Sequence, residues 1–391
     1  MARPIRILHV IDKFTMDGVN PSSCSRLFAE WIPKHDPARF QVDVAGLRPR
    51  DAAGEYLEKQ GIRVYYITEG KFSPKNIRAI EQLAREGQYD MLHLHGYSSA
   101  NFGRIAARRL DIPSVMHEHA VLKVLPHQFV IDWLLRHKTD VAVAVSRAVK
   151  EFLMKGRSVP EHKIRVIWNG VPLQAFQNID AEKVRAFRER LNLPDDAKVI
   201  GTVTRLREEK GNRYFIEAAA QLREKFPQTY YVLIGDGPLR GELEALSRQL
   251  GVDDRVIFAG FVAEVPPALA ALDIVAMPSL REGFGLALAE GMAAGKPVVA
   301  SNVGGLAELA EHDKTALLVP PADASALAAA LERLLTDGDL RERLARAARE
   351  ASSAFSIEAN VAALEVLYTE LYENHRSQRH SEPASLAAVE A

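Results

Sequence analysis

Two stretches in the second half of the chain place charged side chains beside glycines where a strand gives way to a helix. The first is Glu282-Gly-Phe-Gly-Leu-Ala-Leu-Ala-Glu290. Its glycines, Gly283 and Gly285, leave room for a ligand near the backbone, and the helix that follows offers unpaired N–H groups. Its two glutamates could accept hydrogen bonds from the hydroxyls of a polyol. The competing interpretation is that Glu282 caps the helix and Glu290 faces solvent.

The second stretch is Thr202-Val-Thr-Arg-Leu-Arg-Glu-Glu-Lys-Gly211, which also follows an expected strand and opens a helix. Arg205 and Lys210 would lie at the carboxyl end of a parallel strand, where open α/β sheets bind ligands. Two cations beside a helix N-terminus suit a diphosphate. The alternative is a charged surface loop in which Glu208 and Glu209 pair with the two bases.

Two shorter patterns are less specific. Gly235-Asp-Gly237 follows a strand, but Gly241 comes one residue too late for a dinucleotide fingerprint, which favours a tight strand-to-helix turn. His117-Glu118-His119 places two imidazoles on one face of a strand. No third ligand is evident in the sequence, so we predict no metal site there.

Short apolar runs rich in β-branched residues alternate with segments of helical length. In the first half these runs are Ile5–Ile11, Phe40–Ala45, Arg63–Ile67, Met91–Leu94, Ser114–Met116, Val141–Val145 and Ile164–Ile167. In the second half they are Val199–Thr204, Tyr230–Gly235, Val256–Ala259, Ile274–Met277, Pro297–Ala300 and Ala316–Val319. Such alternation is typical of βαβ units, so we predict two doubly wound parallel sheets in series.

The turn residues Asn169-Gly-Val-Pro172 mark the expected domain break. We therefore predict one domain over 1–171 and a second over 172–356. A final helix over about 357–374 would cross back onto the first domain. The Ser-, Arg- and Ala-rich residues 376–391 are expected to be a disordered tail.

Composition excludes several protein classes. Of 391 residues, 47% are hydrophobic and 26% charged, which excludes extensive disorder and fibrous folds. The single cysteine, Cys24, excludes a disulfide framework and a cysteine-based zinc site. We expect a cytoplasmic protein, since no apolar run reaches the length of a membrane span or a signal peptide.

The net charge of −1 conceals an asymmetry. Residues 1–172 hold 26 Lys and Arg against 18 Asp and Glu, and residues 173–391 hold 24 against 33. One interpretation is an anionic partner for the first half, such as the cytoplasmic face of a membrane. The other is compositional drift over solvated faces. We expect no nucleic-acid partner.

Taken together, the motifs resemble the retaining glycosyltransferases of family 4, which have the GT-B fold of two Rossmann-like domains facing a central cleft. The resemblance spans most of residues 5–372. It rests on Asn169-Gly-Val, Arg205-x4-Lys210-Gly, Gly235-Asp-Gly-Pro, Glu282-Gly-Phe-Gly-x4-Glu290, Gly295-x-Pro-Val-Val and Gly304-Gly. It implies a hexosyltransferase whose C-terminal domain binds a nucleotide-diphosphate sugar and whose N-terminal domain binds a sugar, polysaccharide or lipid-linked acceptor.

The resemblance also implies roles for individual residues. Arg205 and Lys210 would hold the diphosphate and stabilise the leaving group without a metal or other cofactor. Glu290 would bind the ribose hydroxyls. The donor sugar would be held by Glu282 and by the backbone of Gly283, Phe284, Gly285 and Leu286. Phe261 and Val262 would border the base, and His119 would contact the transferred sugar.

One loop departs from the family pattern. Where the family usually has Gly-Gly and a polar residue, this chain reads Asp17-Gly18-Val19-Asn20-Pro21. Gly18 still allows the backbone to approach a phosphate, while Val19 and Pro21 alter the loop.

Retention in the family is explained by front-face attack, which needs no enzymic nucleophile, so we assign none to Glu118. Two other functions fit the same motifs. One is a sugar-nucleotide epimerase of the GT-B fold, and the other is a non-catalytic homologue that binds nucleotide sugars.

Overall fold

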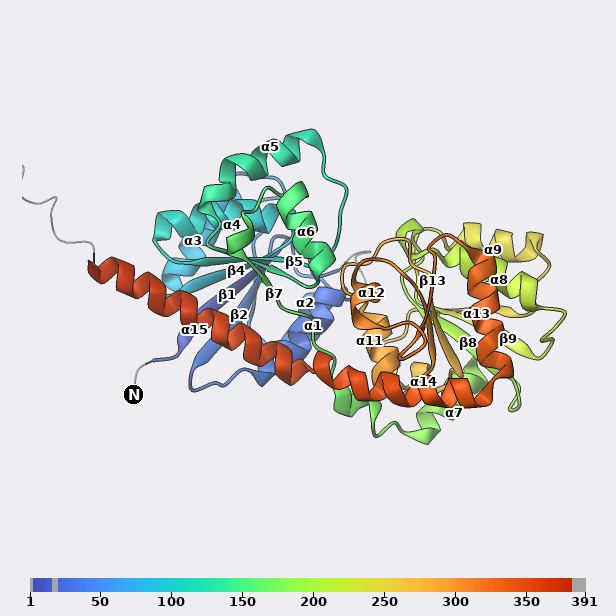
Figure 1. The fold of residues 1–391 in the computed structure, drawn as a ribbon. Coiled ribbons are helices and arrows are strands. Elements are labelled where there is room, and N and C mark those ends of the chain that lie inside the picture. Colours follow the sequence, from blue (N-terminus) through green and yellow to red (C-terminus); the bar gives the residue numbers. More distant parts are fainter. Residues whose placement is uncertain (1–2, 16–19, 382–391) are drawn as a thin grey trace, which may run out of the picture. The chain divides into compact units, whose positions relative to one another are not determined.

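The computed structural model describes residues 3–15 and 20–381, and these residues form two units (Figure 1). The first unit contains the chain up to Val145, residues Lys150–Ile167 and the chain from Glu358 onward. The second contains Ser146–Val149 and Trp168–Ile357. The chain thus enters the second unit a few residues before the boundary we predicted at 171.

The first unit is built on a seven-stranded parallel sheet with the order β3-β2-β1-β4-β5-β6-β7. Its strands are β1 (Ile5–Ile11), β2 (Phe40–Gly46), β3 (Val64–Tyr66), β4 (Met91–His95), β5 (Ser114–Glu118), β6 (Val141–Ala144) and β7 (Ile164–Val166). Helices cover both faces of a parallel sheet, which is why fully apolar runs such as Val141–Ala144 form its buried strands.

Helices connect these strands, as the alternating pattern predicts. They are α1 (Ser23–Trp31), α2 (Ala52–Lys59), α3 (Lys75–Glu86), α4 (Tyr97–Leu110), α5 (Pro126–Leu135) and α6 (Arg147–Gly156). Side-chain caps fix where some of them begin. The carboxylate of Asp51 accepts a hydrogen bond from the backbone N–H of Gly54. The hydroxyl of Ser22 accepts one from the backbone N–H of Ser25.

The second unit holds a six-stranded parallel sheet with the order β10-β9-β8-β11-β12-β13. Its strands are β8 (Lys198–Val203), β9 (Thr229–Ile234), β10 (Val256–Gly260), β11 (Ile274–Met277), β12 (Val298–Ser301) and β13 (Leu317–Val319). Its helices are α7 (Ala181–Arg190), α8 (Asn212–Leu222), α9 (Arg240–Gln249), α10 (Val265–Ala270), α11 (Leu286–Ala293), α12 (Gly304–Leu309), α13 (Ala324–Thr336) and α14 (Gly338–Ala351). The predicted fold class, two doubly wound parallel sheets, is confirmed.

The last helix, α15 (Ile357–Ser381), belongs to the first unit from Glu358 onward. Its residues Leu364, Leu367 and Tyr368 share a buried cluster with strand residues such as Ile7 and Met91. The helix continues to Ser381, so the tail expected from 376 is helical over its first residues, and 382–391 lie outside the described residues.

Each sheet has one point where the strand order changes direction. In the first unit this point lies between β1 and β4, and in the second between β8 and β11. Ligands of open α/β sheets bind beyond the carboxyl ends of the strands at such points, because the connections there diverge to opposite faces.

Candidate functional site

The two charged motifs of the second unit flank its switch point. Arg205 and Lys210 follow β8, and Glu282 follows the neighbouring strand β11. The backbone joins the two loops, since the N–H of Leu280 donates to the carbonyl of Glu209 over 2.9 Å. The two patterns that the sequence analysis singled out therefore form one site.

Glycine is required where these loops touch. Gly211 has a φ of +63°, and a Cβ there would lie 2.0 Å from the carbonyl oxygen of Pro278. Gly304 has a φ of +47°, and a Cβ there would lie 2.2 Å from the carbonyl oxygen of Glu282. The N–H of Gly305 donates to that same oxygen over 3.2 Å. The glycines thus fix the backbone that carries Glu282.

Lys210 and Glu282 form the centre of the site. The Lys210 ammonium donates to the Glu282 carboxylate over 2.6 Å, and the Ser279 hydroxyl lies 3.3 Å from the same oxygen. The side chains of Lys210 and Glu282 are 15% and 13% exposed, so each remains accessible. Helix α11 has Gly285 at its N-cap and no side-chain cap, so the interpretation of Glu282 as a helix cap is wrong.

Arg205 lies in the same loop after β8 as Lys210 and is more exposed. Its guanidinium approaches the Glu209 carboxylate only to 3.9 Å, and 43% of its side chain is accessible. The alternative in which Glu208 and Glu209 neutralise both bases therefore fails for Lys210, whose partner is Glu282.

The remaining donor-side residues differ in exposure. Glu290 is buried in α11, so the expectation that it merely faces solvent is wrong. Gly283 and Phe284 are also buried, and Leu286 is half-buried.

Phe261 and Val262 follow β10 and are exposed and half-buried, respectively. The turn beside them is formed by Gly235, whose N–H donates to the carbonyl of Gly260 over 2.8 Å. Gly235 has a φ of +133°, and a Cβ there would lie 1.9 Å from the carbonyl oxygen of Thr204. Gly235-Asp-Gly237 is therefore a tight turn packed on the loop after β8.

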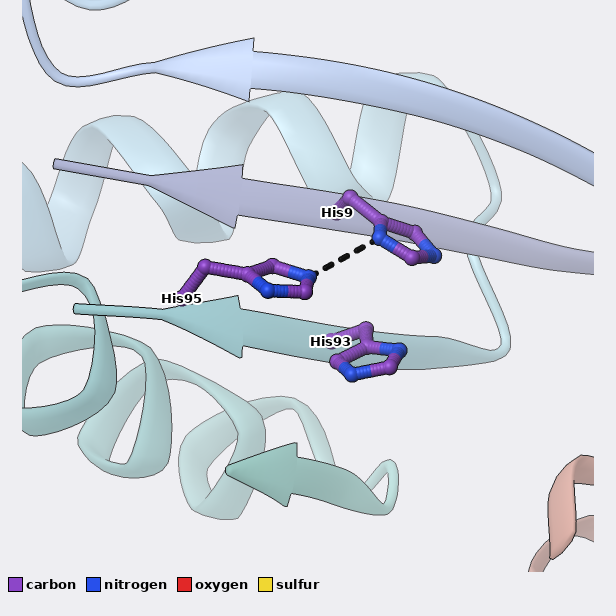
Figure 2. A group of neighbouring side chains, drawn as sticks. All are labelled: His9, His93 and His95. Carbon is purple, nitrogen blue, oxygen red and sulfur yellow. Dashed lines mark hydrogen bonds between the residues drawn. The ribbon is translucent and has the colours of Figure 1, made fainter. Parts of the chain in front are cut away.

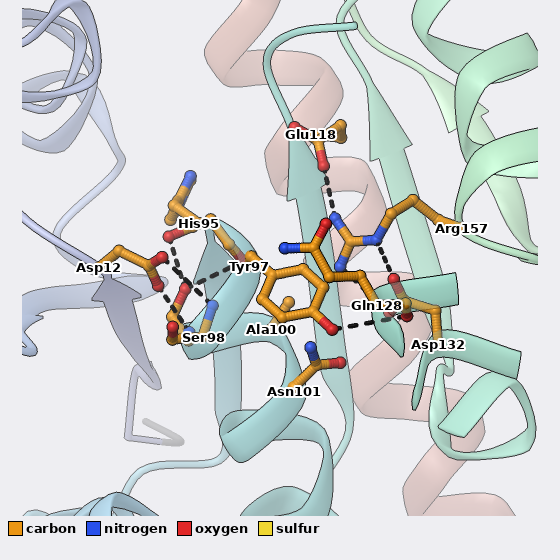
Figure 3. A network of polar contacts seen from close by, with 12 residues as sticks. Asp12, His95, Tyr97, Ser98, Ala100, Asn101, Glu118, Gln128, Asp132 and Arg157 are labelled. Atoms are coloured by element: carbon orange, nitrogen blue, oxygen red, sulfur yellow. Dashed lines mark hydrogen bonds and ion pairs between the residues drawn. The ribbon is translucent and has the colours of Figure 1, made fainter. Parts of the chain in front are cut away.

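In the first unit, Gly18 lies outside the described residues. The switch point there is occupied by a carboxylate of the chain itself (Figure 3). Asp12 accepts from the backbone N–H groups of Ser98 and Ser99 at 3.2 and 2.7 Å, at the start of α4. The N-terminus of this helix is thereby satisfied without a ligand.

His119 ends a chain of buried hydrogen-bonded rings, part of which Figure 2 shows. Five hydrogen bonds link six side chains, each between two ring nitrogens or between a ring nitrogen and the Tyr368 hydroxyl. Their lengths are 2.9, 3.0, 3.3, 2.6 and 3.0 Å, and they connect, in order, His119, His95, His9, Tyr368, His93 and His117. Strand register produces this chain, because His9 pairs with His93 and His95 with His117 across the parallel strands. Trp31 of α1 stacks on His117 with a centroid distance of 5.7 Å.

The chain keeps its imidazoles neutral. Burial lowers the pKa of His9, His93, His95 and His117 well below the usual value, and that of His119 to about 4. Its two end atoms, His119 Nδ1 and His117 Nε2, have no hydrogen-bond partner among the residues that the structure describes. Because a neutral imidazole has one N–H and one lone pair, the proton position on His119 is coupled to that on His117.

The prediction that no third ligand accompanies His117 and His119 is wrong. The ligand atoms of His95, His117 and His119 lie within 4.8 Å of one another, and so do those of His9, His93 and His95. The imidazoles of these two groups hydrogen-bond to one another or to Tyr368, so most of their ring nitrogens already have a partner inside the protein. The arrangement fits a hydrogen-bonded chain better than a metal centre.

Glu118 points to the opposite face of β5, away from the imidazoles (Figure 3). Arg157 donates to it over 2.7 Å and to Asp132 of α5 over 2.5 Å. Arg104 of α4 donates to Asp132 over 2.8 Å. Burial raises the pKa of Glu118, although Arg157 opposes the shift. The carboxylate is engaged in this buried network, which agrees with assigning it no nucleophilic role.

Comparison with known proteins identifies the family. The model described as "Glycosyl transferases group 1" matches residues 183–351, and that described as "Glycosyltransferase Family 4" matches residues 29–175. The D-inositol 3-phosphate glycosyltransferase of Xylanimonas cellulosilytica is 34% identical over 345 residues, covering 79% of this chain and 82% of its own. The chain belongs to the group 1, family 4 glycosyltransferases. It is a transferase enzyme.

Other family members are similarly related. The alpha-D-kanosaminyltransferase of Streptomyces kanamyceticus is 33% identical over 314 residues, covering 75% of this chain and 81% of its own. The solved structure of Anabaena HepE in complex with UDP and glucose aligns with a TM-score of 0.81 at 26% identity, over 93% of this chain and 99% of that one. A glycosyltransferase of Rickettsia africae shares the fold with a TM-score of 0.84 at 22% identity. The fold of this glycosyltransferase is GT-B.

Proposed function

We propose that this glycosyltransferase moves a hexosyl group, with retention of configuration, from a nucleotide-diphosphate sugar to a hydroxyl group of an acceptor. The donor binds the second unit at the switch point between β8 and β11. The acceptor is a sugar, a cyclitol, a polysaccharide or a lipid-linked glycan and binds the first unit. The observation that carries the proposal is the accessible Lys210–Glu282 pair, held by glycines at the place where such sheets bind ligands.

Different side chains bind different parts of the donor. Lys210 and the exposed guanidinium of Arg205 bind the diphosphate and stabilise the charge that develops as it leaves. Because two side-chain cations supply this charge, we propose that the reaction needs no metal ion. Glu282 accepts from hydroxyls of the donor sugar, and Glu290 from those of the ribose. Phe261 and Val262 border the base.

We propose front-face transfer. The bond from C1 of the sugar to the leaving phosphate breaks, the acceptor oxygen bonds to C1 on the same face, and a phosphate oxygen takes the acceptor proton. The account requires no nucleophilic side chain. His119 contributes its unpartnered Nδ1 as the contact to a sugar hydroxyl.

Relatives suggest the first ligands to test. HepE is solved with UDP and with UDP-glucose. Names of curated relatives contain inositol 3-phosphate and 2-deoxystreptamine. We therefore place UDP-hexoses first among donors and these two compounds first among acceptors.

A thermal-shift series with UDP, GDP, ADP, TDP and their hexose conjugates tests the donor site. One nucleotide family should raise the melting temperature, with and without EDTA, since a ligand at a hundred times its Kd stabilises by about 2.7 kcal/mol. Lys210→Ala should abolish the shift. Lys225→Ala, which removes a surface ion pair of the same unit, should keep it. Shifts that persist in Lys210→Ala, or that vanish with EDTA, would contradict the proposed site.

A further inference from the structure

Helix α5 exposes its apolar side chains to solvent. Of the large hydrophobic side chains that are exposed in the described part of the chain, seven of thirteen lie between residues 122 and 134. They are Leu122, Leu125, Phe129, Val130, Ile131, Trp133 and Leu134, here named the α5 face. Scattered exposed apolar residues are ordinary, but a concentration of this kind marks an interaction surface.

The inward side of α5 is charged instead. Asp132 is completely buried and binds Arg157 (Figure 3). It also binds Arg104. Turning the helix to bury its apolar side would separate Asp132 from both arginines and leave the buried Arg104 without its carboxylate partner, at a high desolvation cost. The buried ion pairs therefore fix the helix in the orientation that presents Phe129, Trp133 and their neighbours outward.

The exposed charges of the segment that carries this face have one sign. Between residues 119 and 139 the charged side chains other than the buried Asp132 are Lys123, Arg136 and Lys138. Arg136 stacks on Trp133, with its guanidinium carbon 4.1 Å from the ring centroid. The nearby Asp140 is engaged with the backbone and hydroxyl of Ser114. The face thus combines exposed aromatic and aliphatic groups with a cationic border.

We propose that the α5 face binds the surface of an anionic lipid bilayer. A short helix with aromatic and leucine side chains on one side and basic residues at its border lies in the plane of the bilayer interface, where Trp is favoured. A second copy of this chain fits less well, because a twofold contact uses the same surface of both copies and offers no anionic groups from this segment to the cationic border. No described helix is long and apolar enough to cross a membrane.

This binding goes beyond the proposed transfer reaction and requires no donor, so it is tested separately. The measurement is flotation of the purified protein with vesicles of phosphatidylcholine alone or with about 30% phosphatidylglycerol. The protein should bind the anionic vesicles, and 0.5 M salt should weaken binding, since the attraction is partly electrostatic.

Matched variants locate the contact. Trp133→Gln/Leu134→Gln should weaken vesicle binding at least tenfold, because two apolar side chains no longer leave water. Phe72→Gln/Val366→Gln changes two exposed apolar residues outside the α5 face and should bind as the unmodified chain does. Lys123→Gln/Lys138→Gln should bind more weakly to anionic vesicles and equally to neutral ones.

The same samples give an independent reading. Trp133 is 47% exposed, whereas Trp31 is buried and Trp168 half-buried. Anionic vesicles should therefore shift the tryptophan emission to the blue and protect it from acrylamide, and Trp133→Phe should remove most of both effects. The absence of vesicle binding would overturn the proposal. The proposal would also be overturned if light scattering showed that the protein self-associates and that only Trp133→Gln/Leu134→Gln abolishes this self-association.

Discussion

The two units keep their polar chemistry in different places. In the second unit buried residues such as Phe215, Leu233 and Leu331 form one apolar cluster, and the Lys210–Glu282 pair lies in loops at the edge of the sheet. In the first unit imidazoles and ion pairs lie inside the layers on both faces of β5. Substitutions at the site of the second unit should therefore affect activity, and those in the first unit should affect stability as well.

The largest expected difference is in the response to acid. A buried histidine with a lowered pKa is neutral when folded but takes up a proton when unfolded, so its contribution is complete above about pH 6.5 and falls as the pH drops below that value. The first unit holds six such histidines: the five of the hydrogen-bonded chain, with the pKa of His119 lowered to about 4, and His35. The described part of the second unit holds only His312, which is exposed.

Each of these histidines adds up to about 1.4 kcal/mol per pH unit to the loss of stability. Hydrogen exchange measured between pH 7 and 5 should therefore show the first unit opening while the second stays protected. Equal loss of protection in both units would contradict this account of the buried imidazoles.

Removing the carboxylate of the buried network should destabilise the first unit by about 3–5 kcal/mol. Asp132→Ala leaves Arg104 and Arg157 without that partner inside the protein. The control is Glu332→Ala, which removes a surface ion pair with Lys225 and should cost less than about 1 kcal/mol. Denaturant unfolding measures both, and similar losses would show that the network contributes little.

Removing the cation of the donor site should act on catalysis instead. Lys210→Ala should lower kcat by about 10²–10³-fold, the range for losing one electrostatic contact to developing charge. Its free energy of unfolding should change by less than about 1 kcal/mol, because the side chain is at the edge of the sheet. Unfolding of this variant would indicate that the pair with Glu282 is structural.

A smaller effect on donor affinity distinguishes a glycine that the loop geometry requires from a glycine that can be replaced. Gly304→Ala places a Cβ against the carbonyl of Glu282 at a positive φ, and it should reduce donor affinity while costing about 1–3 kcal/mol of stability. Gly241→Ala in α9 meets no atom within 4 Å and should be neutral or slightly stabilising. Donor titration by calorimetry with both variants checks this, and equal affinities would show that Gly304 does not position Glu282.

The sequence predicted the second unit better than the first for a physical reason. Lys210 and Glu282 each stand next to a glycine in a short sequence motif, so the spacing within each motif indicated a candidate site. The histidine chain combines residues from β1, β4, β5 and α15, and only strand register brings His9 beside His93. Alternate positions place His93 with His95, and His117 with His119, on one face of the sheet. The missed signal was that the neighbouring strand β1 adds His9 to that face. The outward orientation of the α5 face likewise depends on the ion pairs of Asp132 with Arg104 and Arg157, which are distant in sequence.

The most direct test of the proposed transfer is proton NMR of the product anomeric centre. The protein is incubated with the nucleotide sugar that the thermal-shift series identifies. The acceptors offered are inositol 3-phosphate, 2-deoxystreptamine and lipid-linked sugars. The account predicts an acceptor-linked hexose with the anomeric configuration of the donor, formed in the presence of EDTA and absent with Lys210→Ala. A product of inverted configuration, or interconversion of the donor without any transfer, would contradict it.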